Sequence, residues 1–366
     1  MFSAVVFLGS VAAVTASLAR CLGPWAALAG GLLLVLEPWG VQYAHYGMND
    51  VPLTAMLLLA WLAAGGIARG SKTAPLHAAA CGIALGLGFA IKYQALIGLV
   101  FPVLAGWSLW NGGRGKTLAG SAAIFVTTWL GGVLFGSPLL PEHAGYFVEE
   151  FPRFMAWQAN ITGKDLAFHE KAGRNVVWLV RFLLSGWMWM LLPGAGYAAV
   201  RLVRGGGSPQ AQVWVGSGLA FVVTLTALLL VSRDFLRAND VLPILPFLIL
   251  LSVLWLAEPC SLRRRAFMGL AAVALIGAFA ATSLADAAAF SRPDTRGRAR
   301  QWCRHNLKPK ARLLRERYVL SVDRAGIGEV AFRDFSSEKT RRTIADGRYD
   351  VVITSSLAHG RYFDPL

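Results

Sequence analysis

Residues 37–68 read EPWGVQYAHYGMNDVPLTAMLLLAWLAAGGIA, and this stretch decides the fold class. Its second half, residues 51–68, is an uncharged apolar run. A run of this length suits a helix that crosses the roughly 30 Å hydrocarbon core of a bilayer. Its first half holds aromatic residues, a histidine and an aspartate, which are typical of the membrane boundary. The stretch therefore predicts a membrane-spanning helix that begins at a polar boundary.

The same apolar pattern recurs along the chain. Segments of suitable length run at about 2–19, 24–39, 51–68, 76–91, 94–110, 117–136, 176–200, 211–232, 241–257 and 266–284. We therefore expect an all-α polytopic membrane domain of about ten transmembrane helices over residues 1–284. Segments 24–39 and 76–91 are short, and half-spanning or tilted helices are among the expectations there.

The charge of the chain reports its orientation. The formal net charge is +15, but 56% of the residues are hydrophobic and only 15% are charged. A soluble nucleic-acid-binding protein has roughly 25% charged residues, so nucleic acid is excluded as a partner. Cations fill every second short connection, which the positive-inside rule marks as cytoplasmic. These cations are Arg20, Arg69, Lys72, Arg114, Lys116, Arg201, Arg204, Arg263, Arg264 and Arg265.

The opposite connections are predicted to lie outside the cell. They include residues 40–50, the region of Lys92 and the long outer loop 137–175. The tail 285–366 carries 17 basic and 10 acidic residues with few long apolar runs, so it is polar enough to be soluble. It holds a helix pattern at 294–306 and strand patterns at 311–320 and 350–354. We expect a small extracytoplasmic α/β domain there.

Few local motifs point to a chemistry. The chain has no HExxH and no GxSxG pattern, and its four cysteines lie far apart, so no metal site is predicted. Asn49 or Asp50 can cap the helix that follows, with Pro52 in its first turn, and either can also serve a site. Lys92 can extend its ammonium to the membrane interface or pair with an anionic lipid phosphate. These alternatives stay open on the residues alone.

Three stretches resemble a known family. They are VQYAHYGMNDVPLTAMLLLAWLA at 41–63, GIALGLGFAIKYQALIGLVFPVLAG at 82–106 and FLRANDVLPILPFLILLSVLWLA at 235–257. Their order resembles the membrane glycosyltransferases of the GT-C fold, in particular those related to protein O-mannosyltransferases and the lipid A aminoarabinose transferase. The tail, with QWCRHNLKPKARLLRERY and RYDVVITSSLAHGRYF, resembles the extracytoplasmic end of bacterial members. The resemblance covers nearly the whole chain.

The resemblance implies an activity and a set of site residues. Such enzymes transfer a sugar, with inversion, from a polyprenyl-phosphate donor to a lipid, glycan or protein acceptor at the outer face of the bacterial inner membrane. Asp50 would support catalysis as the acid of the second outer loop. The donor phosphate would contact Lys92, Arg153 and Arg237. The cavity would be lined by Tyr43, His45, Asn49 and His169.

The family's catalytic base is an aspartate of the first outer loop, and it has no counterpart in this sequence. Met1 would also begin on the outer side without a charge to hold it there. We therefore expect the chain to lack the first span and the loop with the catalytic aspartate. No cofactor is indicated, and a divalent cation is left open. Two alternatives remain: a lipid-binding or transport membrane protein, and an inactive structural member of the family.

Overall fold

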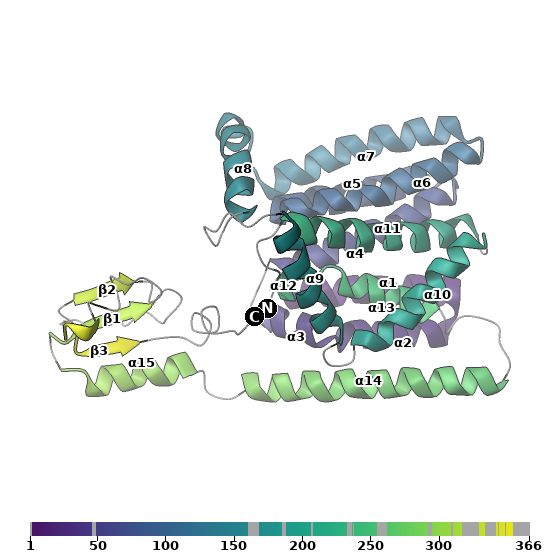
Figure 1. Cartoon of the computed structure of the whole chain (residues 1–366). Coiled ribbons are helices and arrows are strands. Elements are labelled where there is room, and N and C mark those ends of the chain that lie inside the picture. The colour runs from purple at the N-terminus through teal and green to yellow at the C-terminus, as the bar shows by residue number, and fades with distance from the viewer. Residues whose placement is uncertain are drawn as a thin grey trace. The chain divides into compact units, whose positions relative to one another are not determined.

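Figure 1 shows the computed structural model of the chain. It describes residues 2–45, 49–159, 168–184, 188–205, 208–232, 236, 238–254, 262–291, 295–308, 310–316, 329–333, 342, 344–347 and 349–353. The chain divides into two compact units, Met1–Ala287 and Ala288–Leu366.

The regular secondary structure of the first unit is all helical in its described residues. The first half contains α1 (Phe2–Leu22), α2 (Pro24–Val35), α3 (Pro38–His45), α4 (Asp50–Ala68), α5 (Ala74–Ile91), the 3₁₀ helix η1 (Tyr93–Leu99), α6 (Val100–Asn111) and α7 (Gly115–Gly136). The second half contains α8 (Ala144–Ala159), α9 (Phe168–Leu184), the 3₁₀ helix η2 (Met188–Leu191), α10 (Leu192–Val203), α11 (Pro209–Ser232), α12 (Ala238–Val241), α13 (Leu245–Val253) and α14 (Leu262–Phe290).

The polytopic all-α fold is confirmed, with fewer straight spans than expected. Among the described residues, seven helices are long and apolar enough to cross a membrane, or nine if each of two bent pairs is one span. The bent pairs are α2 with α3, at 48°, and α9 with the helical segment Met188–Val203, at 88°. Segment 241–257 differs from the expectation because α13 has only nine residues. Its side chains are nearly all buried, so this apolar run forms part of the protein core.

Two connections that the sequence analysis treated as loops contain helices. Residues 38–45 form α3, whose first turn is capped by Glu37: the carboxylate accepts hydrogen bonds from the backbone N–H groups of Trp39 and Gly40. The long loop 137–175 contains α8 and the first turns of α9. Such helices are short or begin with polar residues, so they contain no long apolar run that would predict them.

Helix α4 lies at the centre of the core because it is apolar on every side, and a helix of that kind is stable only when surrounded. Rings from neighbouring helices meet beside it. Phe101 of α6, Phe221 of α11 and Phe247 of α13 have ring centroids 4.7–5.5 Å apart. Trp61 of α4 stands edge-on to Phe247 at 5.8 Å. These contacts join segments far apart in the sequence into one bundle.

Helices α5 and α7 approach closely because glycines face each other between them. A Cβ atom added at Gly82 would lie 2.5 Å from the carbonyl oxygen of Phe125, and one at Gly86 would lie 2.3 Å from that of Trp129. Small residues at such positions let helix backbones pack against one another in membranes. The glycine run of α5 is therefore a packing surface.

The second unit is a small α/β structure in its described residues. It contains α15 (Thr295–Asn306), β1 (Arg312–Glu316), β2 (Glu329–Arg333) and β3 (Val351–Ile353). The strands form a parallel sheet in the order β2-β1-β3. Cys303, Leu307 and Leu313 form its core, and burial raises the pKa of the Cys303 thiol. The α/β prediction is confirmed, while β2 was not predicted because its sequence, EVAFR, is short and charged at both ends.

Candidate functional site

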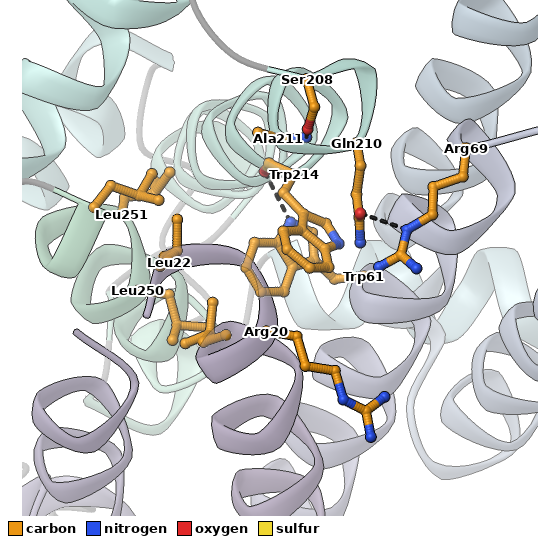
Figure 2. A pocket seen from close by; sticks show the side chains of 12 residues that line it. Arg20, Leu22, Trp61, Arg69, Ser208, Gln210, Ala211, Trp214, Leu250 and Leu251 are labelled. Carbon is orange, nitrogen blue, oxygen red and sulfur yellow. Dashed lines mark hydrogen bonds between the residues drawn. The ribbon is translucent and has the colours of Figure 1, made fainter. Parts of the chain in front are cut away.

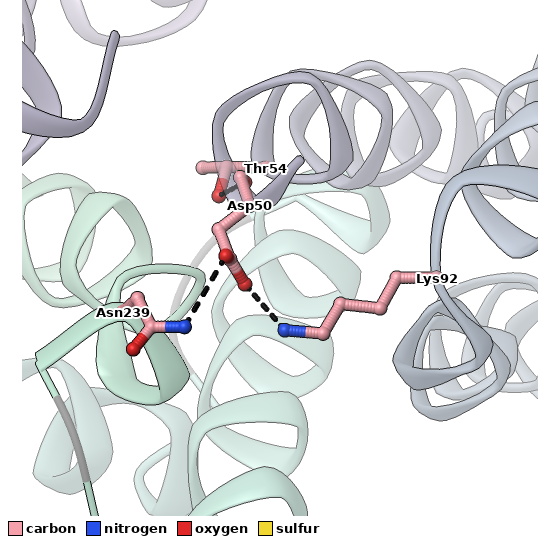
Figure 3. Close-up of polar contacts among 4 residues, drawn as sticks. All are labelled: Asp50, Thr54, Lys92 and Asn239. Atoms are coloured by element: carbon pink, nitrogen blue, oxygen red, sulfur yellow. Dashed lines mark hydrogen bonds and ion pairs between the residues drawn. The ribbon is translucent and has the colours of Figure 1, made fainter. Parts of the chain in front are cut away.

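The centre of the candidate site is an ion pair between two helices (Figure 3). Lys92 Nζ lies 2.6 Å from Asp50 Oδ1. The Asp50 side chain is 6% exposed and that of Lys92 is 20% exposed, so the pair is largely withdrawn from solvent. Burying such a pair costs free energy because both charges lose their hydration, and removing one partner destabilises the protein because the other charge stays buried without compensation. The two charges therefore depend on each other for their position.

Local sequence explains why these two residues meet. Asp50 is the first residue of α4, where the helix dipole favours a carboxylate. Lys92 ends α5 with an extended backbone, at φ −161° and ψ 131°, so its side chain leaves the helix where α5 gives way to η1. Because α4 and α5 are antiparallel neighbours, the start of one and the end of the other lie together. We call this region the Asp50 end of the bundle.

A third segment reaches the same carboxylate. Asn239 of α12 donates a hydrogen bond from Nδ2 to Asp50 Oδ2 at 3.4 Å. The backbone carbonyl of Asp50 accepts a hydrogen bond from Thr54 Oγ1. Both carboxylate oxygens of Asp50 thus have partners from helices 42 and 189 residues away. The carboxylate connects three segments of the bundle.

The other predicted site residues in the stretch 38–50 belong to α3 or to the start of α4. Asn49 is exposed and occupies the N-cap position of α4, but its side chain makes no capping hydrogen bond. Tyr43 of α3 is half-buried and stacks on Trp39 with ring centroids 6.1 Å apart. His45 is the last residue of α3, and its side chain lies outside the described residues.

The described residues show no contact between the predicted residues of the long loop and the ion pair. Arg153 lies on α8 with its side chain 72% exposed, and it pairs with Glu150 one turn earlier. His169 is exposed in the first turn of α9. Arg237 lies outside the described residues. No described contact links Arg153 or His169 to Asp50 or Lys92.

Arg174 of α9 is a site candidate that the sequence analysis did not single out. Its Nε and Nη2 atoms are buried, and no group among the described residues accepts a hydrogen bond from them. The next residue, Asn175, donates to the Leu230 carbonyl near the end of α11 and accepts from the Leu236 backbone N–H. Leu236 lies three residues before Asn239 in the chain, so Asn175, the neighbour of Arg174, contacts the segment that leads to the Asn239–Asp50 hydrogen bond.

A buried guanidinium with unused donors has a chemical implication. Leaving such a donor unpaired costs about 1–3 kcal/mol, and more for a charged group. An anionic ligand with several oxygens would remove this cost through charge-assisted hydrogen bonds. Arg174 is one of many charged residues in the stretch 137–175. Only the packing of α9 distinguishes it from the others, so the sequence alone does not indicate its role.

The described residues hold no group of three His, Cys, Asp or Glu side chains that could bind a metal ion. The polar groups described at the Asp50 end instead include Lys92 and Asn239 around the Asp50 carboxylate, with the buried Asp240 of α12 next to Asn239 in the chain. Such a set suits the binding of a phosphate at the membrane boundary.

One comparison with known proteins gave a match. Residues 1–141 match the family model described as dolichyl-phosphate-mannose-protein mannosyltransferase. The matched segment contains α1 to α7 and includes both members of the Asp50–Lys92 pair. No curated protein and no solved structure matches the chain with significance.

Proposed function

We propose that this chain is a membrane glycosyltransferase of the GT-C type, because residues 1–141 match the dolichyl-phosphate-mannose-protein mannosyltransferase model, and that it takes its sugar from a polyprenyl-phosphate donor at the Asp50 end. The acceptor would be a lipid, glycan or protein at the outer face of a bacterial inner membrane. In this proposal the C-terminal unit is extracytoplasmic. The observation that carries it is the buried Asp50–Lys92 pair within the family segment.

The proposed reaction is a single displacement at the anomeric carbon of the sugar. The acceptor hydroxyl oxygen forms a bond to that carbon from the face opposite the phosphate, which inverts the configuration. The bond from the anomeric carbon to the phosphate oxygen breaks, and its electron pair stays on the polyprenyl phosphate. The hydroxyl proton passes to a base. A phosphate leaving group needs cations to stabilise its growing charge more than it needs an acid.

The cations of the Asp50 end fit that demand. Lys92 has three N–H donors and gives one to Asp50, so two can reach a phosphate. Arg174, next to Asn175 in the chain, offers buried Nε and Nη2 donors. Asp50 is a positioning residue in this proposal: it holds the Lys92 ammonium at the boundary. We assign it this positioning role and not that of the base, because its carboxylate holds Lys92 and Asn239 in place.

The remaining predicted residues differ in the observations that favour them. Tyr43 and Asn49 lie beside the pair along the chain and stay in the proposal as cavity residues. His45 and Arg237 stay in it on the family resemblance alone. Arg153 and His169 are exposed on α8 and α9, so Arg174 replaces Arg153 as the preferred contact of the donor phosphate.

Donor binding by purified protein tests the proposal. The probe is a short-chain polyprenyl phosphate mannose, and the matching polyprenyl alcohol, which lacks the phosphate, measures binding of the chain alone. We expect Lys92→Gln and Arg174→Gln each to weaken binding of the phosphate probe by about ten- to a hundredfold. Each removes a charge-assisted hydrogen bond to the phosphate, which is worth about 1.5–3 kcal/mol. Binding of the alcohol should not change.

The matched control is Arg181→Gln, which removes an exposed arginine from the same helix as Arg174. It should bind the probe as the unmodified chain does. If the phosphate probe bound no better than the alcohol, or if all three variants bound it equally well, the donor assignment would be wrong.

A further inference from the structure

A cavity of about 400 Å³ lies at the other end of the bundle, away from the proposed donor site (Figure 2). Helix α4 has 19 residues, so Asp50 and Arg69, which directly follows the helix, lie about 28 Å apart along its axis. The lining comes from α1, α4, α11 and α13, and from the connections beside them. We call this region the Arg69 end, and the cavity the Arg69 pocket. Its lining residues are Leu18, Arg20, Leu22, Trp61, Arg69, Ser208, Gln210, Ala211, Trp214, Leu250, Leu251 and Leu254.

The lining has a cationic side and an apolar side. In Figure 2, Arg69 and Gln210 stand on one side of the pocket, and Leu22, Leu250 and Leu251 stand on the opposite side. The two indole rings of Trp61 and Trp214 lie between them, 5.6 Å apart. An anionic group with an attached hydrocarbon chain matches both sides at once.

The polar side is built into the structure and still has donors to offer. Arg69 Nε donates to the Oε1 atom of the buried Gln210 side chain, which holds the guanidinium at the pocket. The Arg69 carbonyl accepts a hydrogen bond from Arg114, which fixes the backbone after α4. Within the described residues, no carboxylate pairs with Arg69 or Arg20. Their terminal guanidinium nitrogens therefore remain available to a phosphate.

The indole N–H groups of the two tryptophans between these sides, Trp61 and Trp214, are hydrogen-bonded within the protein. Trp61 Nε1 donates to the Trp214 carbonyl at 2.9 Å, and Trp214 Nε1 donates to the Leu62 carbonyl. With both indole N–H groups satisfied, the rings present apolar surface to the pocket. The ring surface therefore suits the hydrocarbon part of a ligand, and only the arginine side suits its charge.

We propose that the Arg69 pocket binds the phosphodiester head group of an anionic phospholipid. Basic pockets between membrane helices bind such head groups, and the sequence predicts this end to face the cytoplasm, where anionic lipids are enriched. The leucine side receives the first methylene groups of the acyl chains, which a free phosphate would leave uncovered. The pocket is separate from the donor site, so this lipid is a resident ligand and not a substrate.

Lipid titration of the purified full chain, followed by native mass spectrometry, tests the proposal. The probes are phosphatidylglycerol, zwitterionic phosphatidylcholine with the same acyl chains, and inorganic phosphate. We expect phosphatidylglycerol to bind at least about tenfold more tightly than phosphatidylcholine. The double variant Arg20→Gln with Arg69→Gln should lose that preference, and Arg20→Gln alone should reduce it. Since Arg20 is exposed and has no described partner, its replacement should not disturb folding.

The matched control removes the same charge outside the pocket. Lys72→Gln with Lys116→Gln changes two exposed cations, one before α5 and one in the first turn of α7, and it should keep the full preference. An equal loss in this control would show a general charge effect and overturn the proposal. Displacement of phosphatidylglycerol by equimolar inorganic phosphate would assign the pocket to free phosphate and also overturn it. The assay contains no sugar donor, so its outcome is independent of the proposed transferase activity.

Discussion

The Asp50–Lys92 pair shows how single residues acquire a role through their partners. Considered alone, Asp50 was a candidate helix cap and Lys92 a candidate for reaching the membrane interface or a lipid phosphate. In the structure each is the other's partner, at 2.6 Å. Asp50 does occupy the first turn of α4, so a favourable interaction with the helix dipole and a place in the site are compatible.

The pair leads to a prediction about stability. Lys92→Met leaves the Asp50 carboxylate buried without its cation, and we expect it to lower the free energy of unfolding by about 3 kcal/mol. Adding Asp50→Asn should recover part of that loss, because the uncompensated charge is then gone. The midpoint of thermal unfolding in detergent measures both effects.

The control for this experiment is Lys72→Met, which replaces an exposed lysine just before the same helix α5. It should change the midpoint little. An equal loss in Lys72→Met and Lys92→Met, or a further loss on adding Asp50→Asn, would contradict the structural role of the pair.

At the scale of elements, long apolar runs were predictable and bent or short helices were not. The run 117–136 became α7 almost residue for residue, because length and apolarity alone determine such a helix. Segments 24–39 and 176–200 were predicted as single spans, but α2 and α3 meet at 48°, and α9 and the segment Met188–Val203 meet at 88°. The bends depend on how neighbouring helices pack, which no run of apolar letters encodes.

The contact between α5 and α7 leads to a prediction at this scale. Gly86→Ala would place a methyl group 2.3 Å from the Trp129 carbonyl oxygen and 2.9 Å from the Val133 nitrogen. The two backbones would have to move apart, and we expect a loss of about 1–3 kcal/mol of stability. Gly131→Ala is the control, because its added Cβ meets nothing within 4 Å. If both variants unfolded at the same temperature, the close approach of α5 and α7 would be wrong.

At the scale of the whole molecule, two ends of one bundle carry different chemistry. The Asp50 end gathers a carboxylate, an ammonium and an amide from three separate segments, and the Arg69 end gathers arginines that have no described carboxylate partner. The sequence predicted the alternation of charged connections that underlies this division. It also singled out Asp50 and Lys92, which form an ion pair in the structure. It could not identify Arg174 or Asn239, because their neighbours come from folding and not from spacing.

The central claim is that the Asp50 end binds a polyprenyl-phosphate sugar. The most direct measurement is mass spectrometry of lipids that remain bound when the full protein is purified from its native membrane. We expect a polyprenyl-phosphate sugar bound to the unmodified chain and to the Arg20→Gln, Arg69→Gln variant, and its loss from Lys92→Gln and Arg174→Gln. Finding only ordinary phospholipids on the unmodified chain would contradict the claim.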